Sequence, residues 1–271
     1  MGRSTVTGRS PDRPTHSDRQ VSRLSDGVPS IPRNPARSGM ASIIILGGHR
    51  SGTSVTARIV HELGFPAAPT PERLLQPRPG HECDNPDGYY EDIAFVRLHR
   101  RMLGEQNRAL GGWRNPRRDD AEIRRLEGRY RELIRERAVS GDWSLKDPRL
   151  CLLSDVFFDA AAGLEIPMRV VTTFRPIAEI TASLERRGVP FTEAVRITEE
   201  FEAGRQAAVD SARQRGLPVL ATSLVSARSR ADVEDQVWRL QQFLGKADGR
   251  RTARLASLIR IDRSEPKLTP P

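Results

Sequence analysis

A glycine-rich segment between an apolar run and a helical pattern is the part of this sequence best suited to chemistry. Residues 43–46 are four consecutive aliphatic side chains, and glycines follow at positions 47, 48 and 52. Such a run is typical of a parallel strand covered on both faces, and the glycines allow backbone N–H groups to approach an anion. The helix predicted over 53–63 would direct its positive dipole end at the same place. This pattern predicts a phosphate site, with a ligand-free strand-to-helix turn as the alternative.

The spacing of this loop resembles that of the nucleotide-triphosphate loop, G-x-x-x-x-G-K-[ST]. The match runs from Gly47 to Ser54, except that Thr53 stands at the lysine position. That lysine reaches the terminal phosphates of ATP, so its absence disfavours ordinary phosphoryl transfer. The positive charge of the loop lies at Arg50 instead. The residues that we expect to hold a phosphate are His49, Arg50, Ser51, Gly52, Thr53 and Ser54.

A second candidate phosphate contact follows a later predicted strand. Residues 168–174 read as that strand, Arg175-Pro176 ends it, and Ser183 lies eight residues beyond Arg175 on the helix that follows. Ligands of parallel α/β sheets bind at the carboxyl ends of strands, so Arg175 and Ser183 can converge on one anion there. The equal alternative is an arginine that caps a carbonyl or pairs with a surface carboxylate, beside a serine that only packs.

Two further residues have types and positions that suit catalysis. Lys146, one of only three lysines in the chain, ends a short predicted strand, although a surface pair with Asp147 is an equal alternative there. Glu91 lies at a helix start beside a proline-rich connection, where a general base could act and where acidic residues also occur for dipole reasons alone. Its rivals for the role of base are Glu72, Glu82 and Asp92.

The rest of the pattern predicts one α/β domain after an N-terminal tail. The chain has 271 residues with 37% hydrophobic content, which is enough for a real core. Residues 1–39 are rich in Arg, Ser, Pro and Asp and have no apolar periodicity, so we expect a disordered tail followed by a domain over 40–271. Alternating strand and helix patterns predict a three-layer P-loop-type fold with a mainly parallel central sheet of four to five strands flanked by helices.

Charge, cysteine content and hydropathy narrow the class of partner. The net charge is +9, but arginines scatter among glutamates along the helices instead of forming a stripe with aromatics, so no nucleic-acid partner is expected. Cys83 and Cys151 form no C-x-x-C pair, which predicts two reduced thiols and no metal site. No run resembles a signal peptide or a membrane span, so we expect a cytoplasmic protein without a membrane partner. The pattern does not indicate an oligomeric state.

Taken together, these motifs resemble the sulfotransferases that use 3′-phosphoadenosine 5′-phosphosulfate. Residues 49–54 resemble their donor-binding loop, and the spacing from Arg175 to Ser183 is similar to their second signature. Residues 85–91 and 145–149 look like segments of bacterial members. Arg50 stands where many cytosolic members carry lysine. Their C-terminal glycine-and-lysine motif has only imperfect substitutes, Gly245-Lys246 and Gly249-Arg250-Arg251.

The resemblance implies in-line transfer of a sulfuryl group from this donor to an acceptor hydroxyl on a small molecule or glycan, without a metal. Loop amides would hold the 5′-phosphate, and Arg175 with Ser183 would hold the 3′-phosphate by charge-assisted hydrogen bonds worth about 1.5–3 kcal/mol each. Glu91 would remove the acceptor proton, while Arg50 and Lys146 would stabilise charge on the sulfuryl and bridging oxygens. The alternative functions are a P-loop kinase-like ATP-dependent transferase and a non-catalytic nucleotide-binding protein.

Overall fold

The computed structural model describes residues 1–2, 41–77, 87–105 and 114–259. All of the described helices and strands belong to the unit formed by Pro35–Pro271. Residues 3–39 of the expected tail, the rival base Glu82 and the cysteine Cys83 lie outside the described residues.

Strands and helices alternate along the described chain, as the sequence pattern predicts. The strands are β1 (Ser42–Leu46), β2 (Trp143–Lys146), β3 (Met168–Thr173) and β4 (Val219–Thr222). The helices are α1 (Thr53–Glu62), α2 (Ile93–Met102), α3 (Asp120–Val139), α4 (Leu150–Ala162), α5 (Ile177–Glu185), α6 (Phe191–Gln214), α7 (Arg230–Leu244) and α8 (Gly249–Ser257), with 3-10 turns η1 (Pro71–Arg73) and η5 (Leu224–Ser226).

The four described strands form one parallel sheet in the order β2-β1-β3-β4. From β1 the chain continues to β2, toward one edge of the sheet, and from β3 it continues to β4, toward the opposite edge. Ligands of open α/β sheets bind in the crevice where such connections diverge, at the carboxyl ends of the strands. The fold therefore directs attention to the segments that follow β1 and β3, and it confirms the predicted parallel sheet.

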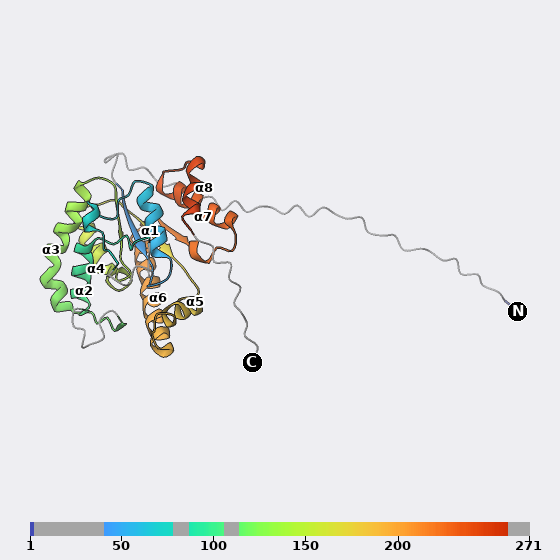
Figure 1. Ribbon diagram of the computed structural model, residues 1–271, viewed down its shortest axis with the longest axis horizontal. Coiled ribbons are helices and arrows are strands. Elements are labelled where there is room, and N and C mark those ends of the chain that lie inside the picture. Colours follow the sequence, from blue (N-terminus) through green and yellow to red (C-terminus); the bar gives the residue numbers. More distant parts are fainter. Residues whose placement is uncertain (3–40, 78–86, 106–113, 260–271) are drawn as a thin grey trace. The chain divides into compact units, whose positions relative to one another are not determined.

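Helices cover both faces of the sheet, so the fold has three layers (Figure 1). Ile43 and Ile45 pack with α1, α7 and α8, whereas Ile44 and Leu46 pack with α2, α3, α4 and α6. None of the four side chains is exposed, and each such burial contributes about 1.5–3 kcal/mol. The run of four aliphatics is therefore the central covered strand that the sequence indicates.

Helix α8 contains Gly249-Arg250-Arg251, one of the two imperfect substitutes for the C-terminal glycine-and-lysine motif. Asp248 caps it by accepting a hydrogen bond from Arg250 N at 3.0 Å. Arg251 Nη2 donates to the Glu62 carbonyl at the last turn of α1, a helix of 10 residues. Because such a helix is about 15 Å long, this contact lies far from the glycine loop at the other end of α1.

The second substitute, Gly245-Lys246, also lies away from the crevice. Gly245 ends α7 with a positive φ of 70°. Lys246 Nζ lies 3.4 Å from Asp142 Oδ2, just before the amino end of β2. Neither segment joins the glycine loop at the carboxyl edge of the sheet.

Of the described helices, none has the length and apolar composition needed to cross a membrane.

Candidate active site

The loop between β1 and α1 is packed so tightly that two of its positions admit only glycine. A Cβ atom at Gly47 would lie 2.0 Å from Thr173 Oγ1. Gly52 has a φ of 92°, and a Cβ atom there would lie 2.8 Å from Val225 Cγ2. Arg50 also has a positive φ, 67°, which is uncommon outside glycine. The loop makes the sharp turn that its glycines predict.

Two of the hydroxyl side chains at the loop, those of Ser51 and Thr53, are buried. Ser51 Oγ donates to the Gly48 carbonyl at 2.8 Å and lies 2.8 Å from Thr173 Oγ1. Thr53, at the position of the usual lysine, is buried. Gly52 precedes α1 and has no side chain to cap it, so the first-turn N–H groups face outward along the helix axis. These amides, rather than the two buried hydroxyls, are the groups of the loop that suit a phosphate.

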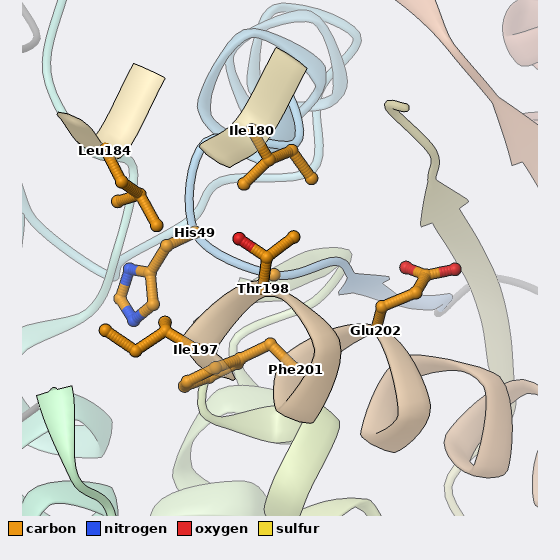
Figure 2. Close-up of a pocket in the computed structure, with 8 residues that line it drawn as sticks. His49, Ile180, Leu184, Ile197, Thr198, Phe201 and Glu202 are labelled. Carbon is orange, nitrogen blue, oxygen red and sulfur yellow. The ribbon is translucent and has the colours of Figure 1, made fainter. Parts of the chain in front are cut away.

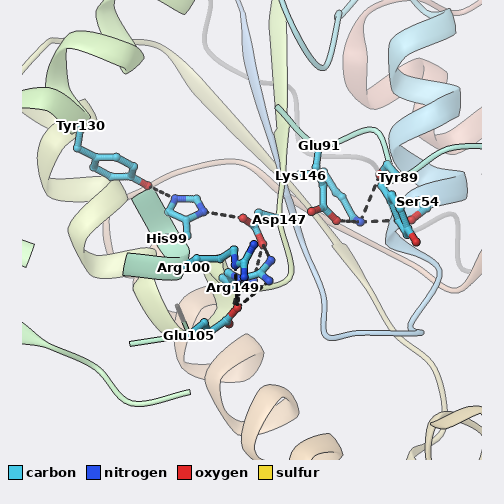
Figure 3. A network of polar contacts seen from close by, with 10 residues as sticks. All are labelled: Ser54, Tyr89, Glu91, His99, Arg100, Glu105, Tyr130, Lys146, Asp147 and Arg149. Atoms are coloured by element: carbon cyan, nitrogen blue, oxygen red, sulfur yellow. Dashed lines mark hydrogen bonds and ion pairs between the residues drawn. The ribbon is translucent and has the colours of Figure 1, made fainter. Parts of the chain in front are cut away.

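Lys146 brings the loop and the predicted base together at the end of β2. Its Nζ lies 2.5 Å from Glu91 Oε1, 3.2 Å from Ser54 Oγ and 3.3 Å from the Tyr89 carbonyl oxygen (Figure 3). Only 3% of Lys146 and 5% of Glu91 is exposed. The structure thus rules out the alternative of a surface pair with Asp147, because Lys146 is buried and pairs with Glu91.

The surroundings of Glu91 make its carboxylate more basic than usual. Burial raises the pKa of Glu91 above its ordinary value, Lys146 opposes this, and Asp147 reinforces it as a nearby like charge. A carboxylate with a raised pKa is a better proton acceptor at neutral pH. Glu91 is therefore a buried carboxylate at the end of β2 with a raised pKa.

The rivals to Glu91 are engaged elsewhere or exposed. Asp92 caps α2 by accepting from Ala94 N at 2.9 Å, and it pairs with Arg73 at 2.8 Å. Glu72 lies exposed in η1. Among the described rivals, none contacts Lys146 as Glu91 does.

Arg175 and Ser183 both contact Arg50, which stands between them. Arg50 Nε donates to Ser183 Oγ at 3.0 Å, and Arg175 Nη1 donates to the Arg50 carbonyl at 3.1 Å. Arg175 Nε also pairs with Glu179 at 2.9 Å. Both predicted residues of the second phosphate grip therefore lie at the glycine loop, and the contacts of Arg175 in this ligand-free structure are those of the alternative, a capped carbonyl and a surface carboxylate. The sequence pattern did not indicate that Arg50 links them.

His49 points from the loop into a small cavity between α5 and α6 (Figure 2). Its ring meets that of Phe201 edge-on, with the centroids 4.9 Å apart. This cavity, about 10 Å³, is lined mainly by apolar side chains such as Ile197 and is too small for a nucleotide. Burial, followed by the positive charges of Arg149 and Lys146, lowers the pKa of His49 to about 3. His49 is therefore neutral at physiological pH and adds no positive charge to the loop.

A larger groove opens at the carboxyl end of β4. It has a volume of about 530 Å³ and is lined partly by Phe174, which directly precedes Arg175 and is 47% exposed. Gln236 Oε1 accepts from Thr222 Oγ1 at 3.0 Å and from Ser223 N at 2.7 Å in the wall of this groove. No motif in the sequence pointed to Gln236, because its partners come from another element.

Behind Lys146 lies a buried polar network that the sequence interpretation missed. His99 Nδ1 lies 2.8 Å from Asp147 Oδ2, and His99 Nε2 lies 2.8 Å from Tyr130 Oη (Figure 3). The side chains of His99 and Asp147 are wholly buried. The signal was present, since His99 falls between the buried Phe95 and Met102 of α2, where helical spacing calls for an apolar residue.

Arg149 completes this network on the other side of Asp147. Arg149 Nη1 lies 3.0 Å from Asp147 Oδ1, and its Nε and Nη2 contact Glu105 Oε2 at 2.9 and 2.8 Å. Although burial alone would raise it, Arg149 and His99 hold the pKa of Asp147 well below its usual range. Both carboxylate oxygens of Asp147 therefore have protein partners. Asp147 follows a strand beside the glycine loop, which is where ATP-dependent enzymes carry an aspartate that binds magnesium.

The described residues include one free thiol and no cluster arranged to hold a metal ion. Cys151 is a free, buried thiol, and burial raises its pKa to about 12. Within the described ranges, no group of three or more His, Cys, Asp or Glu side chains is arranged to hold a metal ion.

Comparisons with known proteins give a limited result. No protein-family model matches the chain, and no curated protein sequence matches it. One solved structure to which it is similar is the sulfotransferase domain from the Synechococcus PCC 7002 olefin synthase, with 13% sequence identity and a TM-score of 0.43. That match covers 82% of this chain and 78% of the other. At this identity and TM-score the likeness is one of outline and does not indicate what this chain binds.

Proposed function

We propose that this chain is a sulfotransferase that moves a sulfuryl group from 3′-phosphoadenosine 5′-phosphosulfate to an acceptor hydroxyl. The observation that carries the proposal is the position of Arg175, whose Nη1 lies 3.1 Å from the Arg50 carbonyl at the mouth of the glycine loop. This donor has anionic groups at both its 5′ and 3′ positions and needs two separate grips. A loop that grips one phosphate is sufficient for many other nucleotides.

The residues of the crevice fit such a donor in charge and in hydrogen-bonding capacity. The N–H groups at the start of α1, together with Ser54, would hold the 5′ end. Arg175 would hold the 3′-phosphate, and Ser183, which accepts from Arg50, still has its own O–H to donate. The groove that begins at Phe174 has a volume suited to a nucleoside.

The buried pair at the end of β2 would carry out the proton transfer. The donor supplies the sulfuryl group, and the acceptor oxygen would lose its proton to the Glu91 carboxylate. Lys146 contacts both Glu91 and Ser54, so its ammonium group links the base to the loop. Its charge, with that of Arg50, would stabilise the negative charge left on the 5′-phosphate side.

Calorimetry with adenosine 3′,5′-bisphosphate and 5′-AMP tests the two-grip proposal directly. We expect the bisphosphate to bind without magnesium and about 10- to 100-fold more tightly than 5′-AMP, as one additional charge-assisted contact implies. Equal affinity for the two nucleotides would contradict the second grip. Binding that requires magnesium, with turnover of ATP, would instead indicate the kinase-like alternative.

A turnover assay then separates an enzyme from a binding protein. Transfer of labelled sulfate would be measured across a panel of sugars, phenols, lipids and secondary metabolites. We expect product with at least one hydroxyl acceptor. Tight nucleotide binding with a steep salt dependence and no transfer to any acceptor would favour a non-catalytic nucleotide-binding protein.

A further inference from the structure

Helix α2 and the residues next to it are tied to the end of β2 by three successive polar contacts. The first joins Glu91 to Lys146, the second joins His99 to Asp147, and the third joins Glu105 to Arg149 (Figure 3). The six residues come from two short segments, 91–105 and 146–149, and all are buried. Their order along one segment matches their order along the other.

Asp147 is the centre of this set of contacts. One of its oxygens faces His99 Nδ1 at 2.8 Å, and the other accepts from both the backbone N and Nη1 of Arg149 at 3.0 Å. Because Asp147 is adjacent to Lys146 in sequence, any movement of its carboxylate would displace the end of β2. Because His99 lies on α2, the same movement would displace the helix that Glu91 precedes.

We propose that Asp147 is a positioning residue that, held by His99 and Arg149, fixes Lys146 and Glu91 in contact at the carboxyl end of β2. This inference rests on the proposed function for the meaning of the Glu91–Lys146 pair, but its physical content does not depend on turnover. Asp147 acts from behind the pair and has no direct contact with a substrate in this assignment.

The hydrogen bonds of the network have consistent directions. An ionised Asp147 can only accept, so His99 Nδ1–H donates to it. Burial raises the pKa of Tyr130 well above its ordinary value, so the phenol keeps its proton, and its Oη lies 2.8 Å from His99 Nε2. The chain Tyr130–His99–Asp147 thus orients the carboxylate from the far side of α2.

The charge of Asp147 also acts on Glu91. The charged groups that influence Glu91 are Lys146 and Asp147 at the end of β2 and Arg149 at the start of α4. The polar groups at the Lys146 ammonium are Ser54 Oγ of α1 and the Tyr89 carbonyl. Within this set Asp147 is the like charge, so removing it would make Glu91 easier to ionise.

The test is a carbon-13 NMR titration of the Glu91 carboxyl, identified by its loss in Glu91→Gln, in wild type and in Asp147→Asn. Asparagine keeps the size of the side chain and removes its charge. We expect the Glu91 midpoint to fall by about one pH unit in Asp147→Asn. The matched control is Asp155→Asn, which removes an aspartate paired with Arg118 on the surface of α4 and should leave the midpoint unchanged.

A second variant keeps the proposal testable if Asp147→Asn does not fold. His99→Gln removes one of the two contacts that hold Asp147 but leaves its charge, so Lys146 should be held less closely to Glu91 and the Glu91 midpoint should rise. An unchanged midpoint in whichever variant is folded would overturn the inference.

Kinetics separate this inference from the proposed function. In an active enzyme, Asp147→Asn should lower kcat about 10-fold and shift the acid limb of the pH profile, with bisphosphate binding unchanged. A shifted Glu91 titration in a protein that transfers no sulfate would refute the function and leave the positioning role intact. Sulfate transfer with an unshifted Glu91 titration would refute the positioning role and leave the proposed function intact.

Discussion

The carboxyl edge of the sheet carries two polar regions of opposite construction. At the crevice between β1 and β3, Arg50 and Arg175 lie together, and Arg175 pairs with a carboxylate of Glu179 whose side chain is 46% exposed. At the end of β2, the charges of Lys146 and Asp147 each face a buried partner. The first region has cationic groups beside an open groove, and the second is closed and balanced in charge.

This difference indicates a division of roles. Partly exposed guanidinium groups beside outward-facing amides suit the binding of an anionic ligand. Buried ion pairs cost desolvation and contribute weakly to stability, so a set of them is better explained by the geometry it imposes. Under the proposed function we therefore expect donor binding at the crevice and proton transfer in the β2 region.

The largest effect should come from removing the base. Glu91→Gln keeps the shape of the side chain but cannot take a proton, so kcat should fall by about 100-fold or more. Bisphosphate affinity measured by calorimetry should not fall, because Arg175 and the loop amides are unchanged and Lys146 loses only an opposing negative charge. Glu72→Gln, at an exposed rival position, is the control, and a comparable loss of kcat there would refute the assignment of Glu91.

Removing Arg175 should mainly weaken nucleotide binding, whereas removing Glu91 should mainly lower kcat. Arg175→Ala should weaken binding of adenosine 3′,5′-bisphosphate by about 10- to 100-fold and change 5′-AMP binding far less. Arg213→Ala removes an exposed arginine of α6 paired with Asp210, and it controls for general loss of positive charge. If both nucleotides weaken equally in Arg175→Ala, Arg175 does not distinguish the two ends of the donor.

The crevice should also be more sensitive to backbone strain than an open turn. Gly52→Ala should lower the free energy of unfolding by about 1–3 kcal/mol because of its positive φ, with a further loss from the contact with Val225. Gly188→Ala is the matched control, since Gly188 has a φ of 75° and open space around it. Urea denaturation of both variants measures the difference, and equal losses would mean that the Val225 contact is relaxed without cost.

The smallest effect concerns the pH profile of the β2 region. Glu91 accepts a proton only when ionised, so activity should rise with pH as its carboxyl loses its proton. Because burial raises the pKa of Glu91, this rise should lie above the ordinary value of 4.5. No limb from His49 is expected near neutrality, because its pKa is lowered to about 3. A profile that is flat above pH 4.5 would argue against Glu91 as the base.

Much of the fold was predictable because its signals are local. The apolar run at 43–46 and the strand-and-helix pattern after it indicate a parallel sheet without any knowledge of contacts, and the structure confirms it. Helix α8 was missed because its amphipathic pattern is short and rich in arginine. The buried His99 was missed because a histidine between apolar positions has meaning only once Asp147 is opposite it.

The sequence by itself determined the strand, the glycine turn and the chemical types gathered near strand ends, since these depend on residue spacing and backbone freedom. Only the tertiary structure decided that Lys146 pairs with Glu91 instead of Asp147, and that Arg50 lies between Arg175 and Ser183. The physical reason is that each of these pairs spans 55 residues or more of chain. Which side chains meet then depends on strand order and helix docking, and local pattern carries no information about either.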